Sequence, residues 1–490
     1  MNQIIMFAVV LLPILGGVLE FLIPFKKRNC MLIFAEAVCV INSILILIMI
    51  LGNPQDTFTL FRFSGDLSIC LRLDGPAKLF SGMVAFLWPL AVLYSAEYMK
   101  HEEREKSFFM FYIITYGATV GAALAENILT LYFFFEMISL ITLPLIMHTQ
   151  TREAILASRT YMNYMIGGAA FAFIGMVFVL SYGSTSSFVL GGVLDMAKVG
   201  DKTNLLLLIY VFSFFGFGMK TAIWPFSAWL PKAGVAPTPV TALLHAVAVV
   251  NTGAYAVMRI TYYSFGTEML RGTWAQVAVM IPVIFTIVYG CSRALKETHI
   301  KRRLAWSTVS NLSYILFGIV LMTPEGFTGG MSHMLFHSFM KITSFFCAGA
   351  IMYKTGKHYI HELDGLGRKM PATFIIYTAA GLALMGVPGL AGFVSKWKLA
   401  EAAFSAGTPL AIAGVIALLI SALLTAMYML TVSVRAFFPG KDFDYSTVEE
   451  YKDPNWLMLV PLVIFLLIVC YFGLSSGKVI EFITNMSIYG

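Results

Sequence analysis

The sequence predicts an all-α integral membrane protein with about fourteen transmembrane helices. Hydrophobic residues make up 59% of its 490 residues and charged residues only 12%, whereas soluble domains average roughly a half and a quarter. Its apolar stretches are long enough to cross a hydrocarbon core of about 30 Å as helices. Most of them are apolar on every face, unlike the amphipathic helices or alternating strands of a soluble protein.

The predicted spans cover most of the chain. The first span lacks a small-residue cleavage site and is too long for a signal peptide, so we expect it to be retained. In order, the spans are residues 3–25, 31–51, 77–99, 108–124, 127–148, 158–182, 203–225, 239–263, 274–292, 304–322, 329–353, 372–402, 408–438 and 455–480.

The distribution of basic residues predicts that both termini lie on the outer side of a plasma or inner membrane. Lysines and arginines concentrate in alternate loops, including 26–28, 100–106, 293–303 and 354–369. The intervening loops hold only Arg62, Arg72, Lys198, Lys202, Arg271 and Lys478. Because cytoplasmic loops carry an excess of basic residues, the basic loops are placed inside. They also account for the net charge of +7 without a nucleic-acid partner.

Two predicted spans are interrupted by proline and glycine. The first runs into Pro225, and the second carries Pro388 in its middle, within the glycine-rich stretch 386–392. Such breaks free backbone groups that lipid cannot satisfy, so they occur where they line a polar cavity. Either break alone could be a simple kink. Each lies close to a lysine, Lys220 or Lys396, and this recurrence in both halves is typical of transporters built from repeats.

Four of the charged side chains inside apolar spans are singled out as candidates, because a charge at mid-bilayer costs about 2.5–3.5 kcal/mol to insert and is usually functional. They are Glu136, Lys220, Lys341 and Lys396. Glu136 lies about halfway along its span, which argues against a carboxylate at the interface, whereas Lys220 is long enough to snorkel. A Glu136–Lys220 pair would lower the cost of burying both charges and would let a neighbouring charge drive proton release.

A stripe of titratable groups is predicted on one helix. His333, His337 and Lys341 are spaced i, i+4 and i+8, which puts their side chains on one face. Histidine changes charge near neutral pH, so the stripe suits stepwise proton transfer. Structural hydrogen bonding stays an alternative, as does a metal or haem site that would also use His148 or His245. We favour the relay because the sequence offers no obvious further set of metal ligands.

The remaining motifs predict no cofactor. The six cysteines form no C-x-x-C pair, which argues against an iron–sulfur cluster or a disulfide framework. No nucleotide-binding loop of the form G-x-x-x-x-G-K-S/T occurs. The energy for moving charge must therefore come from another gradient or from a partner complex. The basic cluster at 301–303 is interpreted as a cytoplasmic topology signal.

Five stretches of the chain resemble one known family, in the family's order. They are Leu131–Pro144, Lys220–Ala246, Lys301–Tyr314, His333–Gly349 and Gly386–Leu399, within about residues 70 to 440. The chain resembles the antiporter-like subunits shared by respiratory complex I, Mrp-type cation/proton antiporters and membrane-bound nickel–iron hydrogenases. Its short C-terminus, without the long lateral helix of the distal complex I subunit, is more like the hydrogenase and Mrp branches.

The resemblance implies two inverted five-helix repeats. Residues 1–106 would hold the first three helices, 107–264 the first repeat, 265–440 the second repeat, and 441–490 a loop and the last helix. It also implies a hydrated polar axis across the membrane centre, with input and output half-channels. The residues that it places on this proton-translocating axis are Glu136, Lys220, His245, His333, His337, Lys341 and Lys396.

Asn251 departs from the family pattern. Many members carry a second lysine six residues after the histidine of the eighth helix, where this chain has Asn251. An amide cannot hold a proton, so Asn251 is a candidate gap in the relay. The proton could cross this gap through water between Lys220 and the histidines of the eleventh helix. Alternatively, the subunit could conduct poorly or select another ion.

Together these patterns predict a proton-translocating subunit of a larger membrane complex, of the redox-driven hydrogenase type or the Mrp type. Na⁺/H⁺ exchange stays open as the ion chemistry. The expected partners are other membrane subunits and the lipid bilayer. A redox subunit that binds haem or quinone through its histidines is the second hypothesis, and a free-standing secondary transporter is the third.

Overall fold

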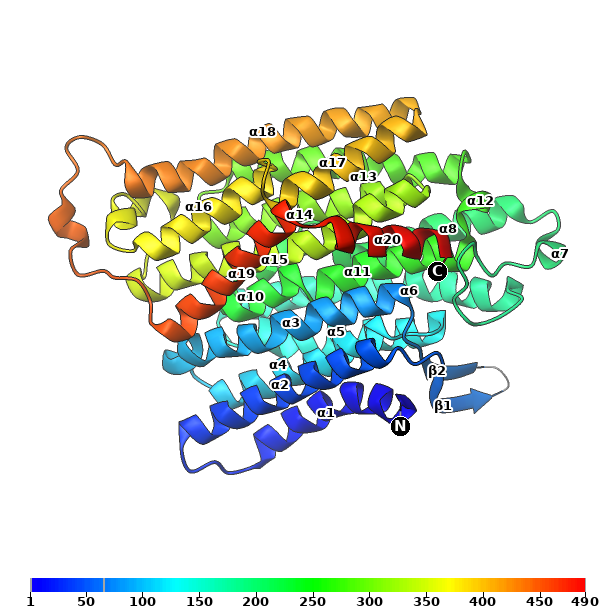
Figure 1. Ribbon diagram of the computed structural model, residues 1–490, viewed down its shortest axis with the longest axis horizontal. Helices are drawn as coiled ribbons and strands as arrows, with labels where there is room; N and C mark the ends of the chain where they lie inside the picture. Colours follow the sequence, from blue (N-terminus) through cyan, green and yellow to red (C-terminus); the bar gives the residue numbers. More distant parts are fainter. Residues whose placement is uncertain (1, 65–66, 490) are drawn as a thin grey trace.

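The computed structural model describes residues 2–64 and 67–489. Its helices run side by side along the longest axis of the molecule (Figure 1). The two ends of the described chain lie at the same end of this bundle, and the connections 23–27 and 438–455 lie at the opposite end (Figure 1).

Helices account for most of the described chain. The longer ones are α1 (Asn2–Leu22), α2 (Arg28–Gly52), α3 (Gly75–Tyr98), α4 (Glu105–Ala123), α5 (Ile128–Ile146), α6 (Arg152–Tyr182), α8 (Thr203–Gly218), α10 (Thr238–Ala246), α11 (Val249–Met258), α13 (Trp274–Lys296), α14 (Ile300–Val320), α15 (Pro324–Thr355), α16 (Pro371–Met385), α17 (Ala391–Ala406), α18 (Pro409–Phe437), α19 (Trp456–Leu474) and α20 (Gly477–Tyr489). The shorter ones are α7 (Met196–Val199), α9 (Trp229–Ala233), α12 (Thr267–Leu270), the π-helix η3 (Arg259–Phe265) and the turns η1 (Met99–His101), η2 (Met219–Thr221), η4 (Ile360–Glu362), η5 (Leu366–Arg368) and η6 (Tyr445–Val448).

The helices confirm the predicted all-α membrane fold. Within residues 2–64 and 67–489, eleven helical segments are long and apolar enough to cross a membrane, and the count of fourteen stays a prediction. The predicted spans 108–124, 304–322 and 372–402 fall outside the eleven. The first still forms a complete helix, α4. The second lies in α14 (Ile300–Val320), whose first turn carries Lys301, Arg302 and Arg303 ahead of the span, and the third is divided into the shorter α16 and α17.

Side-chain caps fix where several long helices begin. Asp74, Asn127 and Thr151 each accept a hydrogen bond from a backbone N–H in the first turn of α3, α5 or α6. Thr323 and Thr408 do the same for α15 and α18, which both begin with proline. These caps satisfy donors that a helix start leaves free.

Two antiparallel strands were not predicted. Strand β1 (Phe58–Ser64) pairs with β2 (Leu67–Leu71) at the same end of the bundle as the termini (Figure 1). Aromatic and β-branched residues dominate 58–63, which favours a strand. The hairpin is short enough to be missed beside the long apolar spans.

Two spans that were expected to be continuous are divided. The span 455–480 is interrupted between α19 and α20, where glycine and serine are concentrated. The span 239–263 is interrupted at Val247 and Ala248, with no proline or glycine to signal it. The N–H groups of both Val247 and Ala248 donate to Leu243 O. The regular pattern of one i→i−4 hydrogen bond per residue is therefore interrupted at this point.

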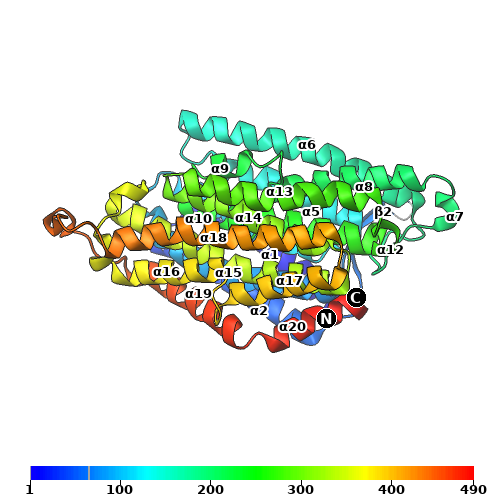
Figure 2. The ribbon, with the colours of Figure 1, turned by 90° about the horizontal axis from the view of Figure 1, so that it is seen from above.

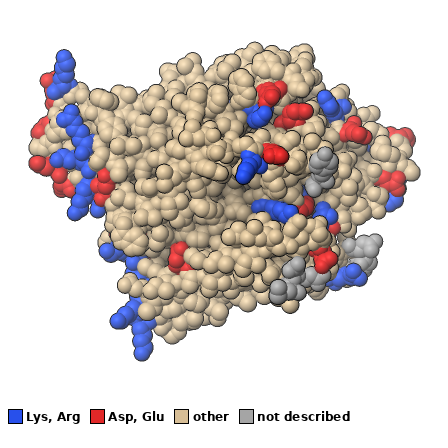
Figure 3. Space-filling view, viewed as in Figure 1, with Lys and Arg blue, Asp and Glu red and all other residues tan. Residues whose placement is uncertain are grey.

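The most polar spans occupy the centre of the bundle. The most apolar stretches of α15 and of 238–265 are buried throughout, whereas less than half of the corresponding stretches of α1, α2 and α6 is buried. Figure 2 shows α6 along one outer edge. On the face drawn in Figure 3, charged side chains gather toward the two ends of the bundle, and a broad band between them holds few. This is the distribution that a lipid environment requires.

Candidate functional site

The first break places Lys220 in the protein interior. Helix α8 ends at Gly218, and the turn η2 that follows carries Lys220, whose side chain is 1% exposed. The indole Nε1 of Trp229 donates to Met219 O at 2.9 Å, which satisfies a carbonyl near the break. An added Cβ at Gly253 would lie 2.7 Å from the Cβ of Lys220, so only glycine lets α11 approach so closely. Pro225 follows η2, as predicted.

The expected ion pair between Glu136 and Lys220 is not formed. No ion pair among the described residues joins them. The Lys220 ammonium instead donates to Phe135 O and lies 3.5 Å from the centroid of the Phe135 ring. Glu136 follows Phe135 on α5, close enough for its charge to act on Lys220, and its Oε1 has no hydrogen-bond partner. The two charges therefore interact through space while Lys220 is held by a neighbouring carbonyl and ring.

The unexpected break at Val247 and Ala248 is held by Asn251. The Asn251 amide nitrogen donates to Ala246 O at 2.8 Å and to Ser338 Oγ at 2.7 Å. Asn251 therefore joins α10, α11 and α15 at one point. Its Oδ1 has no partner although the side chain is fully buried. Helix α11 also packs against Lys220 through Gly253, and Ser338 is the neighbour of His337 on α15.

The predicted stripe lies on α15, and all three of its side chains are fully buried. The rings of His333 and His337 are 6.0 Å apart between centroids. His333 Nδ1 contacts Ser395 Oγ at 2.9 Å, whereas neither ring nitrogen of His337 has a partner. Lys341 Nζ donates to Ser307 Oγ at 2.6 Å. His245 on α10, with both nitrogens unpartnered, is close enough to Lys341 for their charges to interact.

The second break supplies the binding site for Lys396. Helix α16 ends at Met385, Pro388 lies in the break, and α17 carries Lys396 back past the end of α16. Lys396 Nζ donates to Leu384 O at 2.6 Å and to Met385 O at 3.1 Å. A cation at a helix C-terminus is favoured by the helix dipole as well as by these free carbonyls. Lys396 is partly exposed, unlike Lys220 and Lys341.

Unpartnered polar atoms cluster along this series. They include one oxygen of Glu136, Asn251 Oδ1, His333 Nε2 and both nitrogens of His245 and His337. Buried polar atoms are normally satisfied by protein or ordered water. A line of such atoms between lysines has the chemistry of a hydrated path along which protons can be exchanged.

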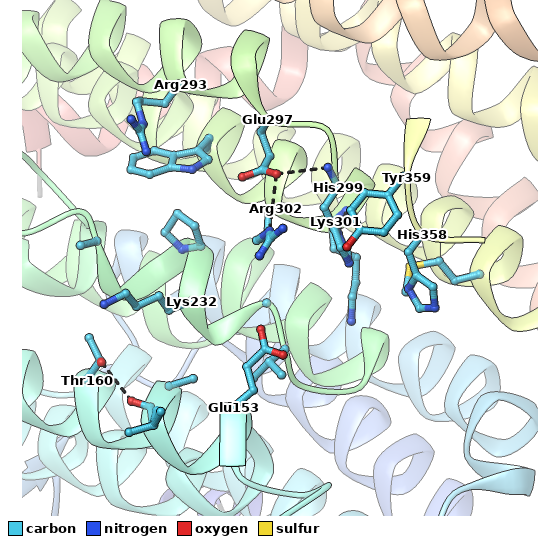
Figure 4. Close-up of a pocket in the computed structure, with 18 of the residues that line it drawn as sticks. Glu153, Thr160, Lys232, Arg293, Glu297, His299, Lys301, Arg302, His358 and Tyr359 are labelled. Carbon is cyan, nitrogen blue, oxygen red and sulfur yellow. Dashed lines mark hydrogen bonds and ion pairs between the residues drawn. The ribbon is translucent and has the colours of Figure 1, made fainter. Parts of the chain in front are cut away.

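A polar cavity of about 890 Å³ lies at one end of the bundle. Figure 4 shows Glu153 and Lys232 extending toward it from one side, with Glu297 and Arg302 on the opposite side. Lys301 lines the cavity as well, and its Nζ donates to Ala236 O at 2.8 Å. Lys301 is also close enough to His245 for its charge to act there.

Two of the three basic residues at 301–303, which are interpreted as a topology signal, are also buried in the structure. Lys301 is 5% and Arg303 is 6% exposed. Arg303 donates to Glu297 O at 2.9 Å and to Tyr428 O at 2.8 Å, which ties α14 to α18. Next to them, burial and the charges of Lys301 and Arg302 lower the pKa of His299, the N-cap of α14, to about 4.

Sequence reasoning missed a buried ion pair that anchors the fold. Arg259 on η3 is fully buried and donates to both carboxylate oxygens of Asp74 at 2.7 Å. Burial acts to raise the pKa of Asp74, but Arg259 outweighs it and holds that pKa below its ordinary value. A lone arginine inside the apolar span 239–263 was the available signal.

The described residues contain no group of three or more histidine, cysteine, aspartate or glutamate side chains placed to hold a metal ion. The arrangement defines the chain as a multi-pass membrane protein whose buried lysines and histidines are placed around helix breaks. Buried charges beside helix breaks are the pattern of membrane proteins built from transporter-type repeats.

The comparisons with known proteins specify this class. Residues 125–433, more than half of the chain, match the family described as NADH:quinone oxidoreductase/Mrp antiporter, transmembrane. The chain belongs to this family, which confirms the resemblance inferred from its motifs.

Curated relatives match the chain in sequence, and solved structures match its fold. The Na(+)/H(+) antiporter subunit A1 of Staphylococcus aureus (strain Newman) is 28% identical over 433 residues, covering 83% of this chain and 52% of the relative. The chain therefore spans about half the length of the curated relatives it matches. A chain from the archaeal membrane-bound sulfane sulfur reductase aligns with TM-score 0.84 at 21% identity, covering 99% of this chain and 97% of that chain. A chain of the Mrp complex from Dietzia sp. DQ12-45-1b gives 0.85 at 20% identity, with 99% and 97% coverage. A chain of respiratory complex I from Thermus thermophilus gives 0.81 at 21% identity, with 99% and 98% coverage.

Proposed function

We propose that this chain is the proton-translocating subunit of a multi-subunit membrane complex, of the Mrp type or the redox-driven type. One observation carries the proposal. Lys220, Lys341 and Lys396 are held by carbonyl and hydroxyl oxygens, and no carboxylate within the described residues forms an ion pair with them. Between them lie histidines with free ring nitrogens. Such groups can gain and lose protons in sequence.

The proposed path has an access route and an exit. Protons reach His245 from the polar cavity past Lys301, and Lys396 is the exit because it is the partly exposed lysine of the series. Glu136 modulates Lys220 through space. Asn251, which cannot hold a proton, orders a water through its free Oδ1 and so bridges the two halves.

The proposal includes the arrangement of the chain in the membrane. Residues 107–264 and 265–440 are the two inverted repeats, flanked by 1–106 and 441–490. The termini face outward across a plasma or inner membrane, because the basic loops lie at the opposite end. Supporting this division, each half contains a helix break followed by a lysine-holding site, at η2 and between α16 and α17.

Replacement of single axis residues tests the function. Inverted vesicles of the native membrane would carry Lys220→Met or Glu136→Gln, and a dye sensitive to the pH gradient would follow proton movement. Addition of Na⁺ and addition of an electron donor are separate arms, which distinguish antiport from redox-driven pumping. We expect both variants to lose proton movement while folding normally, and the exposed-loop control Lys441→Met to keep it. Wild-type movement in both variants would defeat the proposal.

A further inference from the structure

A second set of polar residues lies outside the predicted axis, in the second half of the chain. Ser307, Ser310 and Tyr314 are spaced i, i+3 and i+7 on α14, which puts them on one face. On α18 a similar face carries Ser421, Thr425 and Tyr428, and α13 contributes Cys291. All seven side chains are fully buried. We call these seven residues the hydroxyl cluster.

One end of the hydroxyl cluster contacts Lys341. The Lys341 ammonium donates to Ser307 Oγ at 2.6 Å, and the Tyr428 hydroxyl contacts the same oxygen at 2.6 Å. Thr425 Oγ1 lies 3.1 Å from the Tyr428 hydroxyl. A continuous hydrogen-bonded chain therefore leads from the lysine on α15 to the middle of α18.

The other end of the hydroxyl cluster reaches the surroundings of Lys396. Cys291 Sγ lies 3.7 Å from Thr425 Oγ1 and 2.7 Å from Ser421 Oγ, so it joins the two parts of the chain. Tyr314 donates to Ser421 Oγ at 2.6 Å. The ring of Tyr314 then lies 5.1 Å from Lys396 Nζ.

We propose that the hydroxyl cluster is a proton relay between Lys341 and Lys396, parallel to the histidine stripe. This inference rests on the proposed function, since a relay has a role only if protons move through the chain. Hydroxyl groups both donate and accept hydrogen bonds, so a chain of them can reverse its direction as protons pass. The members come from three helices and together connect two lysines. If each hydroxyl only satisfied a carbonyl of its own helix, this arrangement across helices would not be needed.

The transfer balances at each step. When Lys341 releases a proton, one N–H bond breaks and one O–H bond forms at Ser307. The Tyr428 hydroxyl, which donates to Ser307 in the structure, rotates and accepts the proton that Ser307 gives up. The same exchange repeats to Tyr314, where the proton leaves toward Lys396 or the free Nε2 of His333, whose ring is 5.1 Å from that of Tyr314. Each oxygen or sulfur gains one proton and loses one, and no electron moves.

Cys291 is the step that limits this relay. A thiol is a weaker hydrogen-bond donor and acceptor than a hydroxyl, and Cys291 stands between Thr425 and Ser421. Cys291→Ser should therefore keep or increase proton movement, whereas Cys291→Ala should reduce it. This ordering would not arise if the cluster only filled space, since serine and alanine are both small.

The test measures proton movement in native vesicles that carry the assembled complex. Ser421→Ala and Tyr428→Phe each remove one oxygen of the chain and should reduce the rate about tenfold, equivalent to about 1.4 kcal/mol on the barrier. Ser421→Thr restores the hydroxyl and should recover the rate. The matched controls are Ser213→Ala and Tyr210→Phe, buried hydroxyls of α8 in the other half of the chain, which should leave it unchanged.

The outcomes separate this relay from the function on which it rests. If wild-type vesicles move no protons, the proposed function fails. If they do, and Lys341→Met abolishes the movement while Ser421→Ala and Tyr428→Phe match the wild type, only the relay is overturned. Equal losses in the control variants also contradict it. If Ser421→Ala or Tyr428→Phe lowers the amount of assembled complex, the comparison of Cys291→Ser with Cys291→Ala takes its place. Proton movement no faster in Cys291→Ser than in Cys291→Ala would then overturn the relay.

Discussion

Replacing Asn251 with valine removes the amide that holds the break between α10 and α11. The amide nitrogen makes two buried hydrogen bonds, at 2.8 Å to Ala246 O and 2.7 Å to Ser338 Oγ. Each bond contributes about 0.5–1.5 kcal/mol, so their loss should cost about 1–3 kcal/mol of unfolding free energy. Ser338 keeps its own bond to Met334 O, which places most of the penalty on Ala246 O.

Denaturant unfolding of the purified protein in detergent measures this cost. The matched control is Asn42→Val on α2, because Asn42 is also a fully buried amide but neither of its polar atoms has a partner. Valine there loses no hydrogen bond and removes an unsatisfied group, so the control should be neutral or stabilising. If Asn251→Val destabilises the protein no more than Asn42→Val does, then Asn251 does not hold the break.

Three further predictions follow from the same contacts. Arg259→Leu leaves the buried carboxylate of Asp74 without its main partner and should destabilise the protein by about 3–5 kcal/mol, measured by the same unfolding assay; a cost below 1 kcal/mol would contradict the anchoring role. The pKa of His299 is lowered to about 4 in the folded protein, so protonation favours unfolding, and the free energy of unfolding should fall as pH drops from about 6.5 toward 4. His299→Asn, which can still cap α14, should flatten this pH dependence. A pH profile identical to that of the wild type would refute this role of His299. Asn251→Lys introduces a titratable group into the path and should change the pH profile of proton movement; an unaltered profile would mean that the position is silent.

The sequence could predict the parts of the fold that depend on local chemistry. Apolar length located the helices, and proline with glycine located the breaks near Pro225 and Pro388. The break at Val247 could not be found in this way because it contains neither residue. It is stabilised by Asn251, whose hydrogen bond to Ser338 joins residues far apart in the chain.

Only part of the candidate site could be predicted from the sequence, because many of its contacts join residues far apart in the chain. Helical spacing placed the α15 stripe correctly, since its members share one element. The sequence could not show that Lys220 contacts the Phe135 carbonyl rather than Glu136, because both lie on α5 and differ by one position. Nor could it show that Lys301 is buried, since a basic cluster indicates the side of the membrane but not the depth of each side chain.

The hydroxyl cluster was predictable from the sequence only in part. Serine, threonine and tyrosine recur at helical spacing on α14 and α18, and this periodicity was visible in the sequence. What the sequence could not supply is that the two faces meet around Cys291, because that depends on how three helices pack.

The most direct test of a single connected axis compares Lys220→Met and Lys396→Met, which lie in the two halves of the path, with the double variant. Proton movement in native vesicles is measured for all three at equal amounts of assembled complex. A single axis predicts that each single variant abolishes movement as fully as the double variant, because residues that act as a unit are not additive. If each single variant instead kept about half of the wild-type rate and only the double variant lost it, each half would conduct separately, and the account of one continuous axis would be contradicted.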